Sequence, residues 1–339
     1  MVRSIIDQLD TYGPDQCARM DYAQAADYTR RLTRTHYENF TVVSWLLPRD
    51  LKDDFRHVYA FCRWADDLGD EVGDPERSRE LLGWWRRELD ACYDGRPRHP
   101  VFVALRSTIE RRDIPRRPFD DLIDAFVQDQ EVRRYDTWDQ VLDYCTRSAN
   151  PVGRLVLYLC GHRDERRQRL SDATCTALQL ANFWQDVRRD VLERDRIYIS
   201  RDVAEEHDLD LEQMALQVRH DESRRQDGAA RGGGPAPDAN GAAALLPPFR
   251  ATVRAVVDRT WPLFRDGRRL LPLVRRDVRM DIRLFTLGGE SILRKIERRG
   301  YDTFHGRPSL GKPARLALMV RAAVPRLWPG RGVAIEGGS

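Results

Sequence analysis

The sequence predicts an all-α protein, built as a bundle of helices around a central cavity. Apolar residues recur three and four positions apart along most of the 339 residues, which is the spacing of a helix with one buried face. No run alternates apolar and polar residues as a half-buried strand does, and Pro and Gly signals separate the helical runs. Two of these runs carry acids on one face, and we expect them to enclose the cavity.

The predicted helices follow from these Pro and Gly signals. Pro48 ends the first run, and the next begins near residue 50 and continues to a turn signal at 73–75. Pro151 and Gly153 interrupt a later run: Pro bends a helix, and Gly lets another backbone or a ligand come close. The predicted helical runs cover residues 21–47, 50–71, 76–93, 99–112, 118–132, 138–159, 171–193 and 249–299.

The domain organisation follows from changes in composition. Residues 1–20 lack a clear pattern, and we expect a flexible leader there. Residues 21–315 form one predicted domain, interrupted at 221–248 by a stretch rich in Gly, Ala and Pro that we expect to be a disordered insertion. Residues 316–339 are a predicted tail with a weak amphipathic stretch at 316–320. We expect this stretch to close the core and leave open that it lies on a membrane surface.

Two further predictions concern polar residues of these helices. Ser171 and Asp172 are candidate N-caps for the run at 171–193. The run at 118–132 carries several acids beside its apolar positions, and we expect them mainly on a solvated face. These acids are Asp120, Asp121, Asp124 and Asp129.

The first acidic face lies in the stretch 59–71, Tyr-Ala-Phe-Cys-Arg-Trp-Ala-Asp-Asp-Leu-Gly-Asp-Glu. Asp66 and Asp70 are four positions apart and share one side of a helix, together with Arg63 and Tyr59. Like charges at this spacing destabilise a helix by about 0.2–0.5 kcal/mol, and burying a lone carboxylate costs far more. We therefore expect positive charge against this face.

The second acidic face places Asn182, Asp186 and Asp190 on one stripe, within an apolar, aromatic run. Mg²⁺ prefers oxygen ligands and is usually held by one or two carboxylates together with substrate phosphates. The two faces therefore predict two walls of a cavity that binds a diphosphate through Mg²⁺. Neither face has His or Cys at metal-ligand spacing, which argues against zinc.

Composition limits the remaining function classes. The 57 basic and 54 acidic residues leave a net charge of +3, so nothing indicates a nucleic-acid partner. The six cysteines are dispersed without a Cys-x-x-Cys pair, which is typical of a reducing compartment. We find neither a signal-peptide core nor an apolar run of about 18 residues. We expect a cytoplasmic protein and leave open a peripheral contact with the inner membrane.

Several stretches together resemble the squalene/phytoene synthase family. The acidic stretches 59–71 and 182–190 resemble its two aspartate-rich motifs. Segments 36–48, 148–157 and 176–186 resemble its bacterial hydroxysqualene synthase branch, as do 288–293, 300–302 and 307–308. The resemblance covers about residues 25 to 312, apart from the predicted insertion.

The resemblance implies an isoprenoid synthase fold with two or three Mg²⁺ ions bridged by diphosphate. Residues matched to its motifs would hold the metal: Asp66, Asp70, Asn182, Asp186 and Asp190. Arg63 and Arg196 would contact diphosphate, and Tyr59 would orient the site or stabilise a cation. Phe40, Phe61 and Phe183 would line the pocket or pack in the core, and Asp67 and Glu71 would be metal neighbours or surface acids.

The resemblance further implies a reaction. Presqualene diphosphate would lose diphosphate, and water would capture the rearranged cation to give hydroxysqualene in squalene and hopanoid synthesis. No nicotinamide is expected, because no hydride is delivered. The alternatives are condensation of two farnesyl diphosphates to presqualene diphosphate, a phytoene-type synthase, or a non-catalytic subunit of a squalene-making complex. Association with other enzymes of the pathway also stays open.

Three positions depart from the eukaryotic members of the family. Arg147 stands where we align a Tyr, which leaves its role undecided. Ser200 replaces a Pro that often ends the segment after the second motif. Gly69 and Arg189 replace acids, so each metal face has fewer carboxylates.

Overall fold

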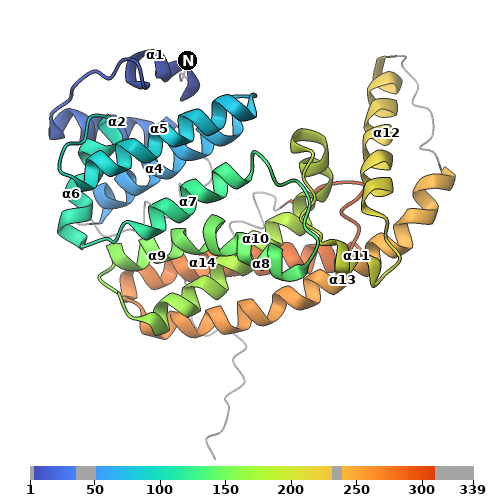
Figure 1. Cartoon of the computed structure of the whole chain (residues 1–339). Helices are drawn as coiled ribbons and strands as arrows, with labels where there is room; N and C mark the ends of the chain where they lie inside the picture. Colours follow the sequence, from blue (N-terminus) through green and yellow to red (C-terminus); the bar gives the residue numbers. More distant parts are fainter. Residues whose placement is uncertain (1–3, 36–50, 231–238, 310–339) are drawn as a thin grey trace, which may run out of the picture.

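The computed structural model describes residues 4–35, 51–230 and 239–309. Within these ranges every regular element is a helix, which confirms the all-α class (Figure 1). In chain order the helices are η1 (Ile6–Gln8), α1 (Leu9–Tyr12), α2 (Tyr22–Thr35), α4 (Lys52–Asp70), α5 (Pro75–Tyr93), α6 (Pro100–Arg112), α7 (Arg117–Gln128), α8 (Trp138–Ser148), α9 (Asn150–Leu159), α10 (Glu165–Arg194), α11 (Arg201–Glu205), α12 (Leu211–Ala230), α13 (Ala239–Gly267), η2 (Arg268–Leu273) and α14 (Arg276–Arg298).

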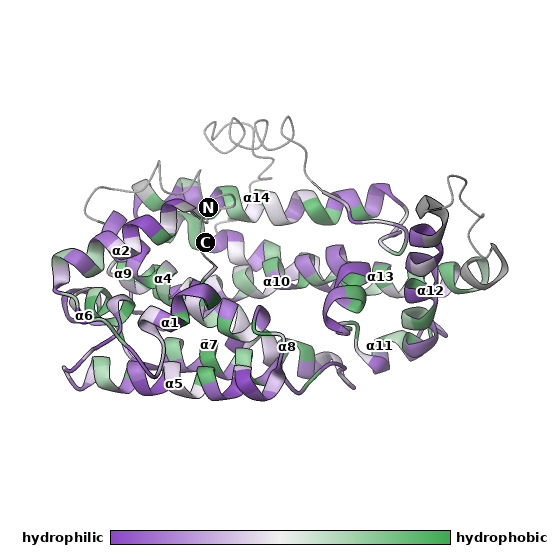
Figure 2. Cartoon of the chain, turned by 90° about the horizontal axis from the view of Figure 1, so that it is seen from above, coloured by the Kyte–Doolittle hydropathy of each residue, from purple (hydrophilic) through white to green (hydrophobic). Residues whose placement is uncertain are grey.

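Two large apolar cores lie side by side in the bundle, and a third, smaller cluster includes Leu157 and Leu270. The first is formed by α2 and α4 to α7, with stacked aromatic rings at its centre, such as Trp64 and Trp85 with ring centroids 5.4 Å apart. The second is formed around α10, which packs against α8, α9, α13 and α14. In Figure 2 each of these helices carries both hydrophilic and hydrophobic segments, as amphipathic helices do. The helix with the first acidic face belongs to one core, and α10 belongs to the other.

The N-terminal residues differ from the predicted flexible leader. Ile5 is fully buried in the first core, and Leu9 and Tyr12 pack against that core. The hydroxyl of Tyr28 donates a hydrogen bond of 2.8 Å to Gln8. The apolar residues at positions 5, 9 and 12 have helical spacing, but the stretch is too short for its pattern to stand out.

The predicted insertion at 221–248 also differs from the structure. Helix α12 continues to Ala230 and α13 begins at Ala239, so only 231–238 lies outside the described residues. Val218 on α12 and Phe249 on α13 are fully buried in the second core. Ala-rich sequence has high intrinsic helix propensity, which extends both helices into a stretch whose composition suggested disorder. In Figure 1, α12 projects from the body of the bundle.

Helix α10 is longer than the predicted run at 171–193 and begins at Glu165. Its N-cap is Asp164, whose carboxylate accepts a hydrogen bond of 3.0 Å from the backbone N–H of Arg167. The predicted caps Ser171 and Asp172 therefore lie inside the helix. A Cβ on Gly153 of α9 would overlap the hydroxyl of Ser171, so the close neighbour at this glycine is a side chain of α10 and not the backbone or ligand that we expected.

The break between α8 and α9 confirms the interruption predicted at Pro151. Pro151 occupies the first turn of α9, where its missing N–H costs nothing. No helix in the described ranges is both long and apolar enough to cross a membrane. Phe40 and the predicted tail at 316–339 lie outside the described residues.

Candidate active site

The two acidic faces line one cavity of about 270 Å³ between the two cores. Helix α4 contributes Asp66 and Asp70, and α10 contributes Asn182, Asp186 and Asp190. The other lining residues are Leu122, Ala125, Phe126, Asp129, Tyr144, Ser148, Gln179, Phe183, Arg194, Arg196 and Tyr198. The structure therefore brings together the five predicted metal ligands and the predicted Arg196.

The two walls lie close enough for one guanidinium to reach both. Nη2 of Arg194 lies 3.0 Å from a carboxylate oxygen of Asp70 on α4, and its Nη1 lies 3.7 Å from Asp190 on α10. Nη2 of Arg196 lies 3.7 Å from Asp70 as well. Positive charge is therefore placed between the opposed acids, as the first acidic face led us to expect.

Most of the negative charge of the α4 wall is balanced by Arg63, which lies on the same helix. Arg63 lies 2.5 Å from Asp67, 3.4 Å from Asp66 and 3.1 Å from Glu71. Asp67 is almost fully buried against Arg63 and faces away from the cavity lining, and burial raises its pKa to about 7. Partial burial and the neighbouring Asp70 raise the pKa of Asp66, although 44% of its side chain stays exposed to water and limits that rise.

Two residues of α4 that we predicted to contact the substrate, Tyr59 and Arg63, do not line the cavity. Burial raises the pKa of Tyr59, and Arg63 is directed at acids of its own helix. Their predicted contacts with substrate stay predictions. Phe61, offered as pocket or core, is fully buried in the first core.

The carboxylates of the α10 wall are less exposed to water than those that α4 contributes to the cavity. The side chain of Asp190 is 11% exposed, and burial together with the nearby Asp186 raises its pKa to about 7. Asp186 is 14% exposed and is paired with Arg307, which comes from the segment after α14. Two carboxylates one turn apart in poorly hydrated surroundings favour either a proton or a cation between them.

The base of the cavity contains an acid that the sequence analysis placed wrongly. Asp129 is buried, not on a solvated face, and accepts a hydrogen bond of 2.9 Å from the hydroxyl of Tyr144. Nη1 of Arg196 lies 3.4 Å from the same carboxylate oxygen. Burial raises the pKa of Asp129 to about 6. Asp129 follows the last residue of α7, where the helical period no longer tells which way a side chain points.

Aromatic rings form the apolar part of the cavity. Phe183 stacks on Tyr198 with ring centroids 3.7 Å apart, and Tyr144 stacks on Tyr198 at 5.8 Å. Phe183 therefore lines the cavity, which is one of the two roles, pocket lining and core packing, that we predicted for it. Arg147 is not among the lining residues, since its guanidinium lies 2.6 Å from Asp143 and 2.9 Å from Gln128.

The donor set fits Mg²⁺ shared with a diphosphate but does not form a cage made of protein ligands alone. Each wall offers carboxylate oxygens, and α10 adds the amide oxygen of Asn182. In the part of the chain that the structure describes, no group of three or more His, Cys, Asp or Glu could hold a metal ion. Mg²⁺ usually takes one or two carboxylates and completes its shell with water and phosphate oxygens. The residues present therefore fit ions that arrive with a diphosphate.

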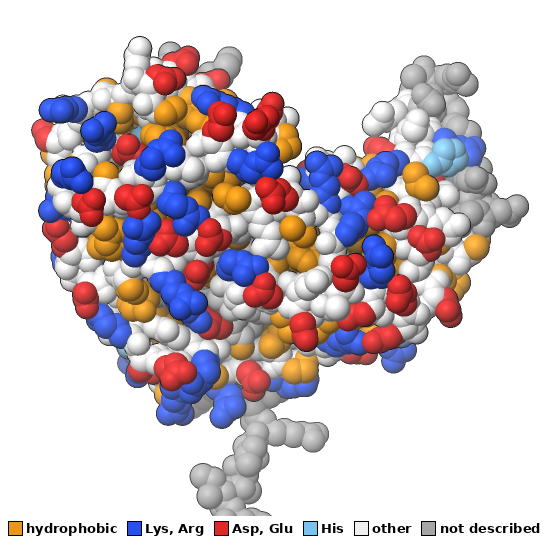
Figure 3. Space-filling model, viewed as in Figure 1, with side chains coloured by type: hydrophobic (Ala, Val, Ile, Leu, Met, Phe, Trp, Pro, Cys, Tyr) orange, Lys and Arg blue, Asp and Glu red, His pale blue; other side chains and the backbone are white. Residues whose placement is uncertain are grey.

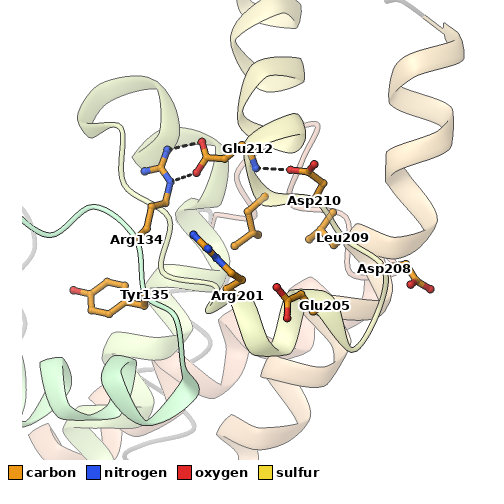
Figure 4. A pocket seen from close by; sticks show the side chains of 9 residues that line it. Arg134, Tyr135, Arg201, Glu205, Asp208, Leu209, Asp210 and Glu212 are labelled. Atoms are coloured by element: carbon orange, nitrogen blue, oxygen red, sulfur yellow. Dashed lines mark hydrogen bonds and ion pairs between the residues drawn. The ribbon is translucent and has the colours of Figure 1, made fainter.

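A second cavity, of about 570 Å³, lies beside α11 and the start of α12 (Figure 4). Arg134 and Glu212 face each other in it as an ion pair with a closest distance of 2.7 Å, and Asp210 accepts a hydrogen bond from the backbone of Glu212. Two of its charged side chains, Arg134 and Glu212, therefore neutralise each other. The space-filling view shows basic and acidic side chains intermixed over the same face (Figure 3). The smaller cavity carries the concentrated acids.

The chain matches the family model described as squalene/phytoene synthase over residues 33–231 and 234–314. It is 36% identical to the hydroxysqualene synthase of Rhodopseudomonas palustris over 189 residues, which are 55% of this chain and 63% of that protein. It is 29% identical to the phytoene synthase of Thermus thermophilus over 303 residues, which are 89% of this chain and 93% of that protein. The chain thus spans less than two thirds of that hydroxysqualene synthase.

A solved structure extends the comparison to the fold. The squalene synthase HpnC from Alicyclobacillus acidocaldarius is 42% identical, with a TM-score of 0.70. The match covers 82% of this chain and 95% of that chain. The likeness confirms the isoprenoid synthase fold that the resemblance implied.

Proposed function

Because this chain belongs to the squalene/phytoene synthase family of enzymes, we propose that it converts presqualene diphosphate to hydroxysqualene and diphosphate with the help of Mg²⁺. The observation that carries the proposal is the meeting of opposed carboxylates from α4 and α10 around Arg194. A diphosphate carried on Mg²⁺ matches that arrangement in charge and in ligand chemistry.

The bound substrate would be held through its diphosphate. In the ligand-free chain Arg194 and Arg196 pair with acids of the cavity. Guanidinium groups bind phosphate oxygens through their planar fork, so both side chains can turn to the diphosphate once metal ions neutralise the acids. Mg²⁺, when bound, would stabilise the negative charge on the departing diphosphate.

The carbocation left behind would face the aromatic wall. Rings attract a positive charge through their faces without forming a bond to it. Phe183, Tyr198 and Tyr144 supply such faces directly beside the acidic walls. The hydroxyl of Tyr144 donates its hydrogen to Asp129, which fixes the orientation of the ring beside the cavity. Water then captures the cation, and a proton leaves, to give hydroxysqualene.

Similarity to other members supports this choice and keeps one alternative in view. The hydroxysqualene synthase of Rhodopseudomonas palustris and the squalene synthase at 42% identity favour squalene chemistry. The phytoene synthase of Thermus thermophilus matches over nearly the full length of both chains. Condensation of two prenyl diphosphates is therefore the second candidate. The acids of both walls argue against a non-catalytic subunit.

The experiment is a comparison of substrates with the purified chain. We expect presqualene diphosphate with Mg²⁺ to give hydroxysqualene, with no dependence on reduced nicotinamide and no turnover after metal chelation. Farnesyl diphosphate and geranylgeranyl diphosphate serve as parallel substrates. Conversion of farnesyl diphosphate to presqualene diphosphate, without further turnover, would contradict the proposed step and favour condensation.

The cellular setting follows from the same proposal. The substrate carries a long apolar body, so we propose that the cytoplasmic chain takes it up at the inner membrane surface through a peripheral contact. Association with enzymes that make presqualene diphosphate or consume hydroxysqualene would serve the same end. Binding to vesicles that contain the substrate, compared with vesicles of the same lipids alone, tests the membrane contact.

A further inference from the structure

A segment after α14 crosses the α10 wall of the cavity. We name residues 301–309 the C-terminal strap. Gly300, just before it, and Tyr301, its first residue, both have positive φ and turn the chain back toward α10. Its far end lies at α10, where the side chain of Gln185 donates a hydrogen bond of 2.5 Å to the carbonyl oxygen of Pro308.

The strap is anchored at its start on α13. The ring of Phe304 is buried and packs edge-on against Phe249, with centroids 5.6 Å apart. Asp302 accepts hydrogen bonds from Arg250 of α13 at 3.0 Å and from the backbone N–H of His305 at 3.1 Å. These contacts hold the strap independently of the acidic cavity.

Arg307 is the strap residue that reaches the cavity wall. Its Nε and Nη2 both donate to the carboxylate of Asp186, the second of them at 3.1 Å. This two-nitrogen pairing occupies both oxygens of an acid that would hold Mg²⁺. The Asp186 side chain is only 14% exposed, whereas 47% of the Arg307 side chain is exposed to water. Arg307 can therefore leave the carboxylate without unpacking the core.

The pairing creates a competition at Asp186. A carboxylate whose two oxygens accept hydrogen bonds from one guanidinium is less available to a metal ion. A diphosphate that arrives with its metal ions offers new acceptors to that guanidinium. Metal binding at Asp186 and release of Arg307 are then linked, because each state of the carboxylate excludes the other.

We propose that Arg307 occupies Asp186 in place of the metal, and that it transfers to the diphosphate when metal and diphosphate bind together. The proposal rests on the proposed function, since it assumes a diphosphate site between α4 and α10. Its consequence is ordered loading: the free enzyme takes up little metal, and the diphosphate triggers completion of the site. Arg307 is in this sense a positioning residue for the α10 wall.

The test measures binding and not turnover. Calorimetry with the full chain gives the affinity for Mn²⁺ alone and then for inorganic pyrophosphate at saturating Mn²⁺. We expect Arg307→Gln to bind Mn²⁺ alone about three- to tenfold more tightly than the parent chain, because a competing bidentate pair is removed. Pyrophosphate should bind about three- to tenfold more weakly, because one of its partners is lost.

The matched control is Arg189→Gln on α10. Arg189 is also 47% exposed and is paired with Glu193 rather than Asp186, so the control makes the same change in net charge. Arg307→Lys provides a second variant that keeps the charge without the two-nitrogen fork, and its two affinities should fall between those of parent and Gln variant. Equal affinities in Arg307→Gln and Arg189→Gln, or a change in only one of the two affinities, would overturn the proposal.

The same measurement distinguishes a failure of this proposal from a failure of the proposed function on which it rests. If the parent chain binds neither Mn²⁺ with pyrophosphate nor pyrophosphate alone, the diphosphate site itself is refuted. If the parent chain binds both cooperatively and Arg307→Gln matches Arg189→Gln, only the role of Arg307 is refuted.

Discussion

The two walls of the cavity reach charge balance by different routes. On α4, Arg63 lies one turn from Asp66 and Asp67 and pairs with acids of its own helix. On α10, Asp186 relies on Arg307, which is 121 positions away in the chain. On α4 the charges of Asp66 and Asp67 are thus balanced by local sequence, and only Asp70 pairs with the distant Arg194 and Arg196. On α10, Asp190 has Arg194 of its own helix nearby, whereas Asp186 is balanced only through tertiary structure. The α10 wall should consequently respond more strongly to ligands and to substitution.

The largest expected effect is on catalysis, when either wall loses an acid. Asp186→Ala should lower kcat/KM by about 10²–10³-fold, because it removes stabilisation of charge that develops in the transition state. Asp66→Ala should lower it too, but less, since that side chain is more hydrated. Turnover of presqualene diphosphate checks both variants. Asp124→Ala, an exposed acid of α7 away from the cavity lining, is the control and should keep full activity.

The next effect is on stability and concerns the base of the cavity. Asp129→Asn keeps the size of the side chain but removes the charge beside Arg196. We expect a loss of about 1–3 kcal/mol in the free energy of unfolding, because a buried charged donor loses its ionic partner. Urea denaturation measures it. An unchanged unfolding midpoint would show that Arg196 is satisfied by Asp70 alone.

A smaller effect concerns the dependence of stability on pH, to which acids of both walls contribute. The pKa of Asp190 is raised to about 7 in the folded chain from an ordinary 3.8. Between these values the folded chain holds a proton that the unfolded chain has released, so rising pH lowers stability through this group. Asp67 and Asp129 add to the same trend. The parent chain should therefore lose more stability from about pH 5 to about pH 7.5 than Asp190→Asn does.

Denaturation at the two pH values checks this prediction. Mg²⁺ with pyrophosphate should offset the loss at the higher pH, because a cation replaces the proton between the acids. Identical pH profiles for the parent chain and Asp190→Asn would remove Asp190 from the explanation.

The smallest effect is expected when Arg63 on α4 is replaced, and it concerns the affinity for pyrophosphate. Arg63→Gln should change the affinity for pyrophosphate with Mn²⁺ by less than about twofold, because Arg63 lies closer to Asp67 and Glu71 than to Asp66 and does not line the cavity. Arg196→Gln should weaken it several times more. Calorimetry compares the two. Equal losses would restore to Arg63 the diphosphate contact that the family resemblance implies.

The sequence predicted the parts of the molecule that depend on local spacing. Asp66 and Asp70 are one turn apart on a strongly patterned helix, and Asn182, Asp186 and Asp190 repeat the arrangement, so their faces could be identified. The helix break at Pro151 and a close neighbour at Gly153 were also predictable, since each follows from one residue's chemistry, although the kind of neighbour was not.

The rest depends on contacts between distant segments. Asp129 lies just beyond a helix end, and nothing in its neighbours in sequence shows that Tyr144 and Arg196 will enclose it. Arg307 meets Asp186 only because the strap turns back at Gly300. The alanines near Ala230 and Ala239 extend two helices through a stretch whose Gly and Pro content suggested disorder. For Asp129 and Arg307 tertiary packing decided what local sequence left open, whereas for the two helices the helix propensity of alanine outweighed the Gly and Pro content.

The central claim is that α4 and α10 hold one diphosphate between them through shared metal ions. The most direct measurement is a crystal structure with Mn²⁺ and a non-reactive prenyl thiodiphosphate, in which anomalous scattering locates the ions. The account predicts manganese bound to Asp70 on one side and to Asp186 or Asp190 on the other, bridged by the same diphosphate. Ions attached to a single wall, or a diphosphate bound outside this cavity, would contradict it.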